Sequence, residues 1–176
     1  LGGEAKYRND DLLALLRSLD YLSLHTYAFH DSYYYPTFDW AVEGDADKPL
    51  MEQRRQAVMR AVKHQKDQLA AVKAFLKENG IEKEIHIGET GWAGKDDSHY
   101  GEQGTAAADE LTEKLFHDET RKWTEQANMS CFYFEAFDEP WKSSTVDGSE
   151  SHFGLFTVDR KSTRLNSSHQ IISYAV

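Results

Sequence analysis

Apolar side chains recur along this chain with two different periods, and the changes of period divide it into helices and strands. Between residues 10 and 19, leucines fall at intervals of three and four, which predicts a helix capped by Asn9 or Asp10. Residues 21–27 then alternate apolar and polar side chains, as a half-buried strand does. The chain therefore opens with a helix that leads into a strand.

This succession of helix and strand is predicted twice more. Valines and leucines form one apolar stripe along residues 50–79, which predicts a long helix that stops at Gly80, and a short strand follows at 85–87. A further helix is predicted over residues 105–128 and a third strand over 131–137. Strands that alternate with long helices predict an α/β fold with a parallel sheet, because parallel strands need crossover connections.

Chemically interesting side chains gather where the predicted strands end. The carboxyl ends of parallel strands share one face of the fold, and barrel enzymes hold their catalytic groups there. Each strand end carries a polar side chain and an aromatic ring: His25 and Tyr27, Glu89 and Trp92, Glu139 and Trp141. These six residues are therefore candidates for a single site.

The segment 85–92, Ile-His-Ile-Gly-Glu-Thr-Gly-Trp, is the most informative of these strand ends. Glu89 follows a short apolar strand. Gly88 and Gly91 on either side of it allow a tight bend and the close approach of a ligand. On this segment alone, an ordinary solvated glutamate explains the pattern as well as a catalytic one.

Composition narrows the possible functions. Of the 176 residues, 40% are hydrophobic, which is enough for one domain with a core. No apolar run reaches the roughly 20 residues that a membrane span needs. The net charge of −10 argues against nucleic acid and anionic membranes as partners. The single cysteine, Cys131, excludes an internal disulfide and lies in an apolar run, where it is expected to fill the core.

Aromatic residues make up 12% of the chain, and several follow the first strand. We interpret the segment from Phe29 to Trp40 as a wall or lid beside a site rather than as local packing. The glycine-containing loop 93–104 lacks the lysine and the spacing of a phosphate-binding loop. His25 and His30 are poorly spaced for one metal ion, and no cysteine pair accompanies them. We therefore expect neither a phosphate loop nor a metal site.

Carboxylates at converging strand ends, surrounded by aromatic rings, are the parts of a glycoside hydrolase. Such an enzyme needs an acid that protonates the leaving oxygen. In the retaining class it also needs a carboxylate about 5 Å away that traps the sugar. Aromatic faces suit the apolar face of a pyranose ring.

Three segments carry a more specific signal. They are Gly-Glu-Thr-Gly-Trp at 88–92, Phe-Glu-Ala-Phe-Asp-Glu-Pro-Trp-Lys at 134–142 and His-Phe-Gly-Leu-Phe at 152–156. Together they resemble glycoside hydrolase family 17, the family of β-1,3-glucanases and glucanosyltransferases. The strand at 20–27 and the aromatic segment after it match as well, so the resemblance covers about residues 10–158.

The resemblance implies the C-terminal part of a (β/α)₈ TIM barrel, about strands six to eight with their helices. It also implies retaining hydrolysis of a β-1,3-glucan without a cofactor, and it places the nucleophile at Glu89. Glu139 and Lys142 match family positions that would hydrogen-bond sugar hydroxyls or tune the nucleophile. The substrate-binding residues expected from the resemblance are His25, Tyr27, Trp92, Glu135, Glu139, Trp141 and Lys142, with the direction of Glu135 left open.

Two departures from the family pattern matter. Ala93 stands where the family usually has proline, and the chain has no Asn-Glu pair like the one that carries the family's general acid. We therefore expect residues 1–160 to form a partial barrel that lacks the acid and is inactive alone. Residues 161–176 resemble translated adapter or vector sequence, and we expect them to be a non-native tail.

Three other functions stay open from the sequence. The first is a transglycosylase that passes the sugar to another sugar instead of water. The second is a carbohydrate-binding protein without catalysis, and the third is an unrelated α/β domain. The sequence does not fix the oligomeric state, and family analogy suggests a secreted, periplasmic or wall-associated location.

Overall fold

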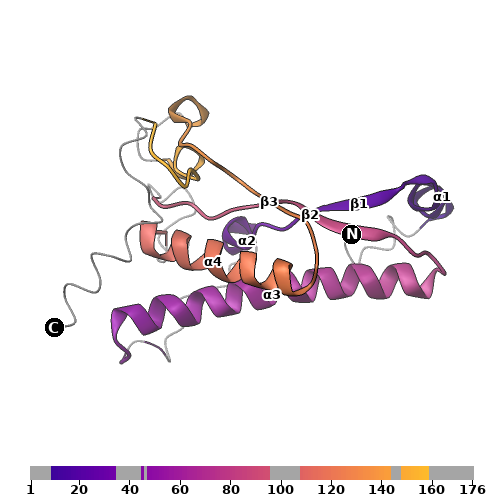
Figure 1. Ribbon diagram of the computed structural model, residues 1–176, viewed down its shortest axis with the longest axis horizontal. Helices are drawn as coiled ribbons and strands as arrows, with labels where there is room; N and C mark the ends of the chain where they lie inside the picture. Colours follow the sequence, from indigo (N-terminus) through magenta and orange to yellow (C-terminus); the bar gives the residue numbers. More distant parts are fainter. Residues whose placement is uncertain (1–8, 35–44, 46, 96–107, 144–147, 159–176) are drawn as a thin grey trace.

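The computed structural model describes residues 9–34, 45, 47–95, 108–143 and 148–158. Within these ranges, a parallel sheet alternates with helices along the chain (Figure 1). This confirms the predicted α/β fold with a parallel sheet. The suspected tail lies outside the described residues.

The sheet has the strand order β1, β2, β3, and neighbouring strands are parallel. The strands are β1 at Tyr21–His25, β2 at Glu84–Thr90 and β3 at Cys131–Tyr133. The helices are α1 at Asp10–Ser18, α2 at Ala28–Tyr34, α3 at Leu50–Glu78 and α4 at Glu110–Gln126. Two short 3₁₀ helices follow β3, η3 at Pro140–Lys142 and η4 at Ser149–Ser151.

Local sequence fixes where several helices begin or end. The side chain of Asn9 accepts a hydrogen bond from the backbone N–H of Leu12 at 2.9 Å, so Asn9 caps α1. Asp109 caps α4 in the same way through the N–H of Thr112 at 2.8 Å. Helix α3 ends just before Gly80, whose φ of 63° is a conformation that glycine adopts at little cost.

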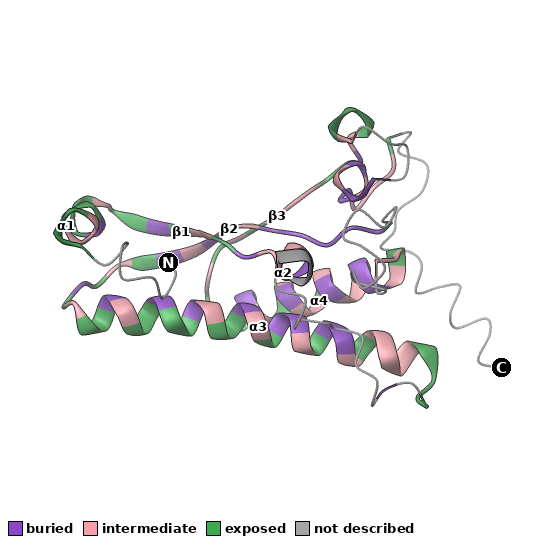
Figure 2. Cartoon of the chain, turned by 180° about the vertical axis from the view of Figure 1, so that it is seen from behind, coloured by how far each residue is buried: buried purple, intermediate pink, exposed green. Residues whose placement is uncertain are grey.

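Helices α3 and α4 lie side by side against one face of the sheet (Figure 1). Buried side chains recur along α3 at intervals of three and four, so one stripe of the helix packs inward and the rest stays exposed (Figure 2). One core cluster, near the carboxyl ends of the strands, includes Phe29, Val58, Trp92, Phe116 and Phe153. A second, near their amino ends, includes Leu16, Leu22, Leu69, Leu76 and Ile85.

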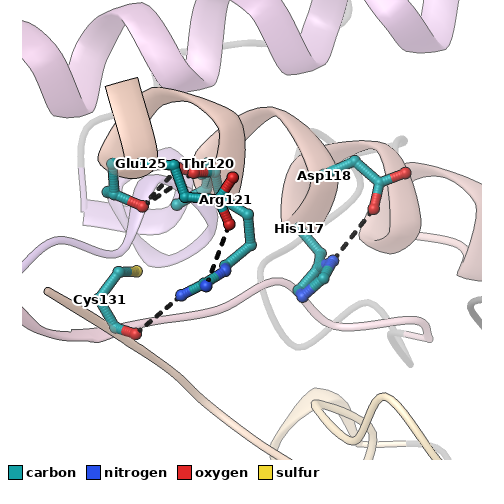
Figure 3. Close-up of polar contacts among 7 residues, drawn as sticks. His117, Asp118, Thr120, Arg121, Glu125 and Cys131 are labelled. Atoms are coloured by element: carbon teal, nitrogen blue, oxygen red, sulfur yellow. Dashed lines mark hydrogen bonds and ion pairs between the residues drawn. The ribbon is translucent and has the colours of Figure 1, made fainter. Parts of the chain in front are cut away.

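Arg121 ties α4 to β3 (Figure 3). Its guanidinium donates to the backbone carbonyl of Cys131 at 3.4 Å and to Glu125 Oε1, one turn along the helix, at 3.2 Å. Burial raises the pKa of the Cys131 thiol, and the nearby guanidinium opposes this only in part. The thiol therefore stays protonated at neutral pH. Cys131 is only partly buried and lies outside both core clusters, so it does not fill the core as expected.

The third strand is shorter than the predicted 131–137, because the backbone changes partners after Phe134, whose N–H still donates to the carbonyl oxygen of Thr90 in β2 at 2.7 Å. From Glu135 onwards, backbone hydrogen bonds of 2.9 to 3.0 Å join this segment to residues 153–156 instead of to β2. A parallel bridge between Phe137 and Phe156 belongs to the same pairing. The segments 134–142 and 152–156, which the sequence singles out, therefore pair directly.

The predicted aromatic wall after the first strand needs correction. Phe29 lies in helix α2 rather than in a loop, and it is 0% exposed. Its ring centroid is 5.4 Å from that of Trp92 and 5.6 Å from that of Phe153, so Phe29 fills the core. Residues 35–40, which complete the predicted wall, lie outside the described residues.

Gly91 allows two backbone segments to pass close together. A Cβ at this position would lie 2.2 Å from the carbonyl oxygen of Phe134 and 3.0 Å from the ring of Phe153. Gly91→Ala should therefore lower the free energy of unfolding by about 1–3 kcal/mol, since the added methyl group forces these segments apart. Urea unfolding followed by circular dichroism measures the loss.

Gly80→Asn is the matched control for this substitution. Nothing lies within 4 Å of a Cβ at Gly80, and asparagine tolerates the positive φ there. We expect the control to lose less than about 1 kcal/mol. A loss as large as that of Gly91→Ala would show that close packing at Gly91 does not govern its cost.

Candidate active site at the carboxyl ends of the strands

Strand β2 contains one more residue than β1 along their shared ladder. Leu24 lies opposite Ile87, but the next residue, His25, lies opposite Glu89, so Gly88 is the extra residue of a bulge. Glycine fits closely there, because a Cβ on Gly88 would lie 1.7 Å from the hydroxyl oxygen of Ser23, which would have to rotate away. The sequence predicted the close approach of a ligand at Gly88, but the group that lies close to it is the Ser23 side chain of β1.

The bulge changes which side of the sheet each later residue of β2 faces. Ile85 and Ile87 are buried on the helix side, and regular alternation would put Glu89 on that side too. Because Gly88 is inserted, Thr90 is buried instead, and Glu89 lies beside His25 on the open side. Thus the strand end turns a carboxylate outward at the point where sequence alternation alone would bury it.

Glu89 has a hydrogen-bonding partner on each side. His25 Nδ1 lies 2.9 Å from its Oε2, and the Tyr27 hydroxyl donates to the same carboxylate. The Glu89 side chain is 34% exposed, so part of it is open to a ligand. Burial raises the pKa of the Tyr27 hydroxyl far above its usual range, and the Glu89 carboxylate raises it further, so Tyr27 remains a donor.

Two residues that the sequence did not single out as site residues lie beside this group. His30, on α2, lies with its ring centroid 4.9 Å from that of Tyr27, and its Nε2 is 3.8 Å from Glu150 Oε1. Burial lowers the pKa of His30, while Glu150 and Glu89 oppose the shift. His30 lies in the short helix α2 and Glu150 in the 3₁₀ helix η4, and both elements are too short for a periodic pattern to mark their residues.

Lys142 lies between two carboxylates near this group. Its Nζ is 3.1 Å from Glu135 Oε2, it also pairs with Glu139, and it lies 4.1 Å from the ring centroid of Phe134. Burial raises the pKa of Glu135, although Lys142 opposes this, and the hydrogen bond to Lys142 lowers the pKa of Glu139. Burial lowers the pKa of Lys142 itself, but the two carboxylates outweigh burial and raise it overall.

Tyr27 connects the two groups. Its ring contacts Phe134 edge-on, with centroids 6.3 Å apart, and the charge of Glu135 contributes to its raised pKa. The structure therefore brings six of the eight residues predicted for the site into one region: His25, Tyr27, Glu89, Glu135, Glu139 and Lys142.

The two predicted tryptophans differ from each other. Trp141, on η3, is 74% exposed and free to meet a ligand. Trp92 is 0% exposed and packs against Phe116, with ring centroids 4.9 Å apart. The expectation that Trp92 lines a sugar subsite is corrected, because its ring has no exposed face. Trp92 instead belongs to the core cluster beneath the carboxyl ends of the strands.

A hollow in the described residues lies elsewhere. It sits between the ends of α3 and α4 and the start of β2, where Leu76, Ile81 and Met129 line it. None of the predicted site residues borders it. The candidate site is thus defined by its polar contacts at the opposite end of β2.

Comparison with known proteins identifies the family of this chain. The family model described as glycosyl hydrolases family 17 matches residues 8–164. The chain belongs to this family. The resemblance inferred from the three sequence segments is therefore confirmed, and with it membership of a TIM-barrel family of glycoside hydrolases.

Three proteins illustrate what this family 17 chain is similar to. A glucan 1,3-beta-glucosidase of Arthroderma benhamiae is 37% identical over 82 residues, which are 44% of this chain and 26% of that protein. The solved structure of an endo-laminarinase from Formosa Hel1_33_131 is 46% identical, with a TM-score of 0.82, over 89% of this chain and 40% of that one. A family 17 beta-1,3-glucanosyltransferase from Rhizomucor miehei is 24% identical, with a TM-score of 0.47, over 85% of this chain and 43% of that one.

The family 17 chain thus spans less than half the length of each of these relatives. In the ranges that the structure describes, no three His, Cys, Asp or Glu side chains are placed to hold a metal ion. No helix within the same ranges is both long and apolar enough to cross a bilayer.

The Lys142 contacts predict a pH-dependent loss of stability. In Lys142→Met, the pKa of Glu135 rises further, and Glu139 loses the contact that lowers its pKa. A carboxyl group whose pKa is raised in the folded state destabilises the fold once pH rises enough to ionise it, and Glu135 would do so more strongly in the variant. A carboxyl group whose pKa is lowered stabilises the fold at high pH, and Glu139 would lose this contribution. Both changes therefore remove stability as pH rises. The variant should therefore lose more in its urea midpoint at about pH 7 than at about pH 4.

Lys63→Met is the control for charge removal. Its ion pair with Asp67 is exposed, at 72% and 62% for the two side chains, so its loss should change the midpoint little at either pH. An equal loss at both pH values in Lys142→Met would mean that Lys142 stabilises the fold through packing rather than charge.

Proposed function

We propose that this chain carries the nucleophile of an active site that cleaves β-1,3-glucan with retention of configuration, and that Glu89 is this nucleophile. The observation that carries the proposal is the partly exposed Glu89 carboxylate at the end of β2, held by His25 at 2.9 Å and by Tyr27. Family membership, together with the glucan 1,3-beta-glucosidase and endo-laminarinase relatives, favours a β-1,3-glucan substrate.

The proposed reaction has two steps at the anomeric carbon. An oxygen of Glu89 forms a bond to that carbon, the bond to the leaving oxygen breaks, and a general acid gives this oxygen its proton. Water, deprotonated by the same acid group, then attacks the glycosyl ester and restores the free carboxylate. Tyr27 and His25 hold the carboxylate in one orientation, which lowers the entropy cost of reaching the attacking geometry.

The remaining polar residues suit a neutral, hydroxyl-rich ligand. Glu135 and Glu139 offer acceptors for sugar hydroxyls, and the ammonium of Lys142 between them offers donors. The exposed ring of Trp141 offers a flat face for a pyranose. We assign these residues to substrate binding, while Trp92 has a supporting role.

The general acid is proposed to lie outside this sequence. The chain has no Asn-Glu pair of the kind expected for it, and it covers 40% of the endo-laminarinase chain. Both facts fit the C-terminal part of a TIM barrel whose earlier strands carry the acid. On this basis the 176-residue chain should be inactive on natural glucans.

Hydrolysis and transfer diverge only at the second step, when water or a sugar hydroxyl attacks the glycosyl ester. We place hydrolysis first, because the endo-laminarinase relative shares 46% identity and a TM-score of 0.82 with this chain. Transfer to a second sugar remains the alternative for the whole protein.

The nucleophile can be tested without the general acid. A 2,4-dinitrophenyl 2-deoxy-2-fluoro-β-laminaribioside releases a stable anion that needs no protonation, and the fluorine slows the second step. We expect the chain to gain one fluoroglycosyl group, and peptide mapping by mass spectrometry should place it on Glu89. Glu89→Gln should gain none.

Glu84→Gln is the matched control, because Glu84 lies on the same strand with its side chain 76% exposed at the far end. It should be labelled like the wild type. A label on any residue other than Glu89, or undiminished labelling of Glu89→Gln, would remove the nucleophile assignment.

We expect the chain to cleave a natural glucan far more slowly than the activated fluoroglycoside. Protonation of the leaving group contributes roughly 10²–10⁴ in rate, so the chain should hydrolyse laminarin at least about 100-fold more slowly than an intact enzyme of this family. Reducing-sugar release measures this. Turnover equal to that of the intact enzyme would show that the acid lies within these residues after all.

A further inference from the structure

One polar side chain interrupts the apolar stripe of α3. Gln65 lies three residues after Val62 and four before Leu69, where helical spacing favours an apolar residue, and it is 0% exposed. Burial of an amide costs free energy unless its donors and acceptor find partners. The partners of Gln65 therefore indicate what this residue does.

The Gln65 amide joins two strand ends to two helices. Its Nε2 donates to the carbonyl oxygen of Thr26 at 2.9 Å, to the Thr26 hydroxyl oxygen at 3.1 Å and to the Thr90 hydroxyl oxygen at 2.6 Å. On the other side, the Thr120 hydroxyl of α4 donates to Gln65 Oε1 at 3.4 Å. The three threonines are between 0% and 3% exposed, so the network is shielded from water.

The Thr90 bond exists in only one of the two possible registers of β2. In a regular ladder without the bulge, the residue opposite Thr26 would be Glu89, and Glu89 would face the helices. With the bulge at Gly88, Thr90 faces the helices and meets Gln65, while Glu89 faces the open side. The buried amide thus favours the register that exposes the carboxylate.

We propose that Gln65 is a positioning residue that holds Thr26 and Thr90 on the helix side and thereby keeps Glu89 and Tyr27 aimed at the substrate. Gln65 touches neither the sugar nor the reacting atoms and acts only through the two threonines. The inference rests on the proposed role of Glu89 as the nucleophile. The backbone N–H of Thr26 donates to the carbonyl oxygen of Glu89 at 2.9 Å, and this bond couples the two strand ends that Gln65 contacts.

The first test compares two substitutions on α3 in the 176-residue chain. Gln65→Met keeps the length of the side chain but removes its donors and acceptor, and Val62→Ala loosens the same core without touching the network. With the activated fluoroglycoside, Gln65→Met should label Glu89 at least about tenfold more slowly than the wild type. In Val62→Ala, Glu89 should be labelled at the wild-type rate, even if the urea midpoint of this variant falls as far as that of Gln65→Met.

The second readout needs no reaction. The imidazole of His25 lies 2.9 Å from the Glu89 carboxylate, so its ring NMR signals report whether that carboxylate is in place. Gln65→Met should displace these signals in the same direction as Glu89→Gln, and Val62→Ala should leave them unmoved. If the wild-type chain is not labelled on Glu89, the proposed function fails, and these signals still decide whether Gln65 positions residue 89.

A second pair of variants tests the contact between Gln65 and Thr90 from the strand side. This pair replaces the first test if Gln65→Met does not fold. Thr90→Ser keeps the hydroxyl that meets Gln65, and Thr90→Val keeps the shape without it. We expect slow labelling and displaced His25 signals in Thr90→Val and near wild-type behaviour in Thr90→Ser. Equal behaviour of the two Thr90 variants, or wild-type rate and signals in Gln65→Met, would overturn the proposal.

Discussion

The candidate site depends on one extra residue in β2 and on the buried amide beneath it. The bulge at Gly88 turns Glu89 to the open side of the sheet, and the 2.6 Å contact between Gln65 and Thr90 is available only in that register. A strand end without the bulge would bury the carboxylate against α3 and α4. The exposed position of Glu89 is therefore a consequence of backbone register and of a helix residue far from it in sequence.

Much of this arrangement is visible in the sequence. The change between periods of two and of three to four predicts the order of helices and strands, because one buried face repeats along each element. Since parallel strands end on a common side, the same pattern predicts that His25, Tyr27 and Glu89 meet. The charged residues after β3 follow by the same logic, and Glu135 and Glu139 indeed share the ammonium of Lys142.

The remaining features depend on tertiary contacts that a single sequence does not encode locally. Trp92 follows the strand end like a subsite residue, but its ring is buried, where it packs against Phe29 and Phe116. Gln65 looks like an interruption of an apolar stripe, and only its position on that stripe hints at a buried contact. The third strand ends early because a later segment, 153–156, competes for its backbone hydrogen bonds.

The most direct test is a crystal structure of the Glu89→Gln variant with a laminari-oligosaccharide bound. We predict that the anomeric carbon of one glucose unit lies about 3–3.5 Å from the side chain of residue 89. Tyr27 and His25 should lie beside that side chain, and the bulge at Gly88 should be intact. A sugar bound away from residue 89, or a regular β2 with that side chain turned toward α3, would contradict it.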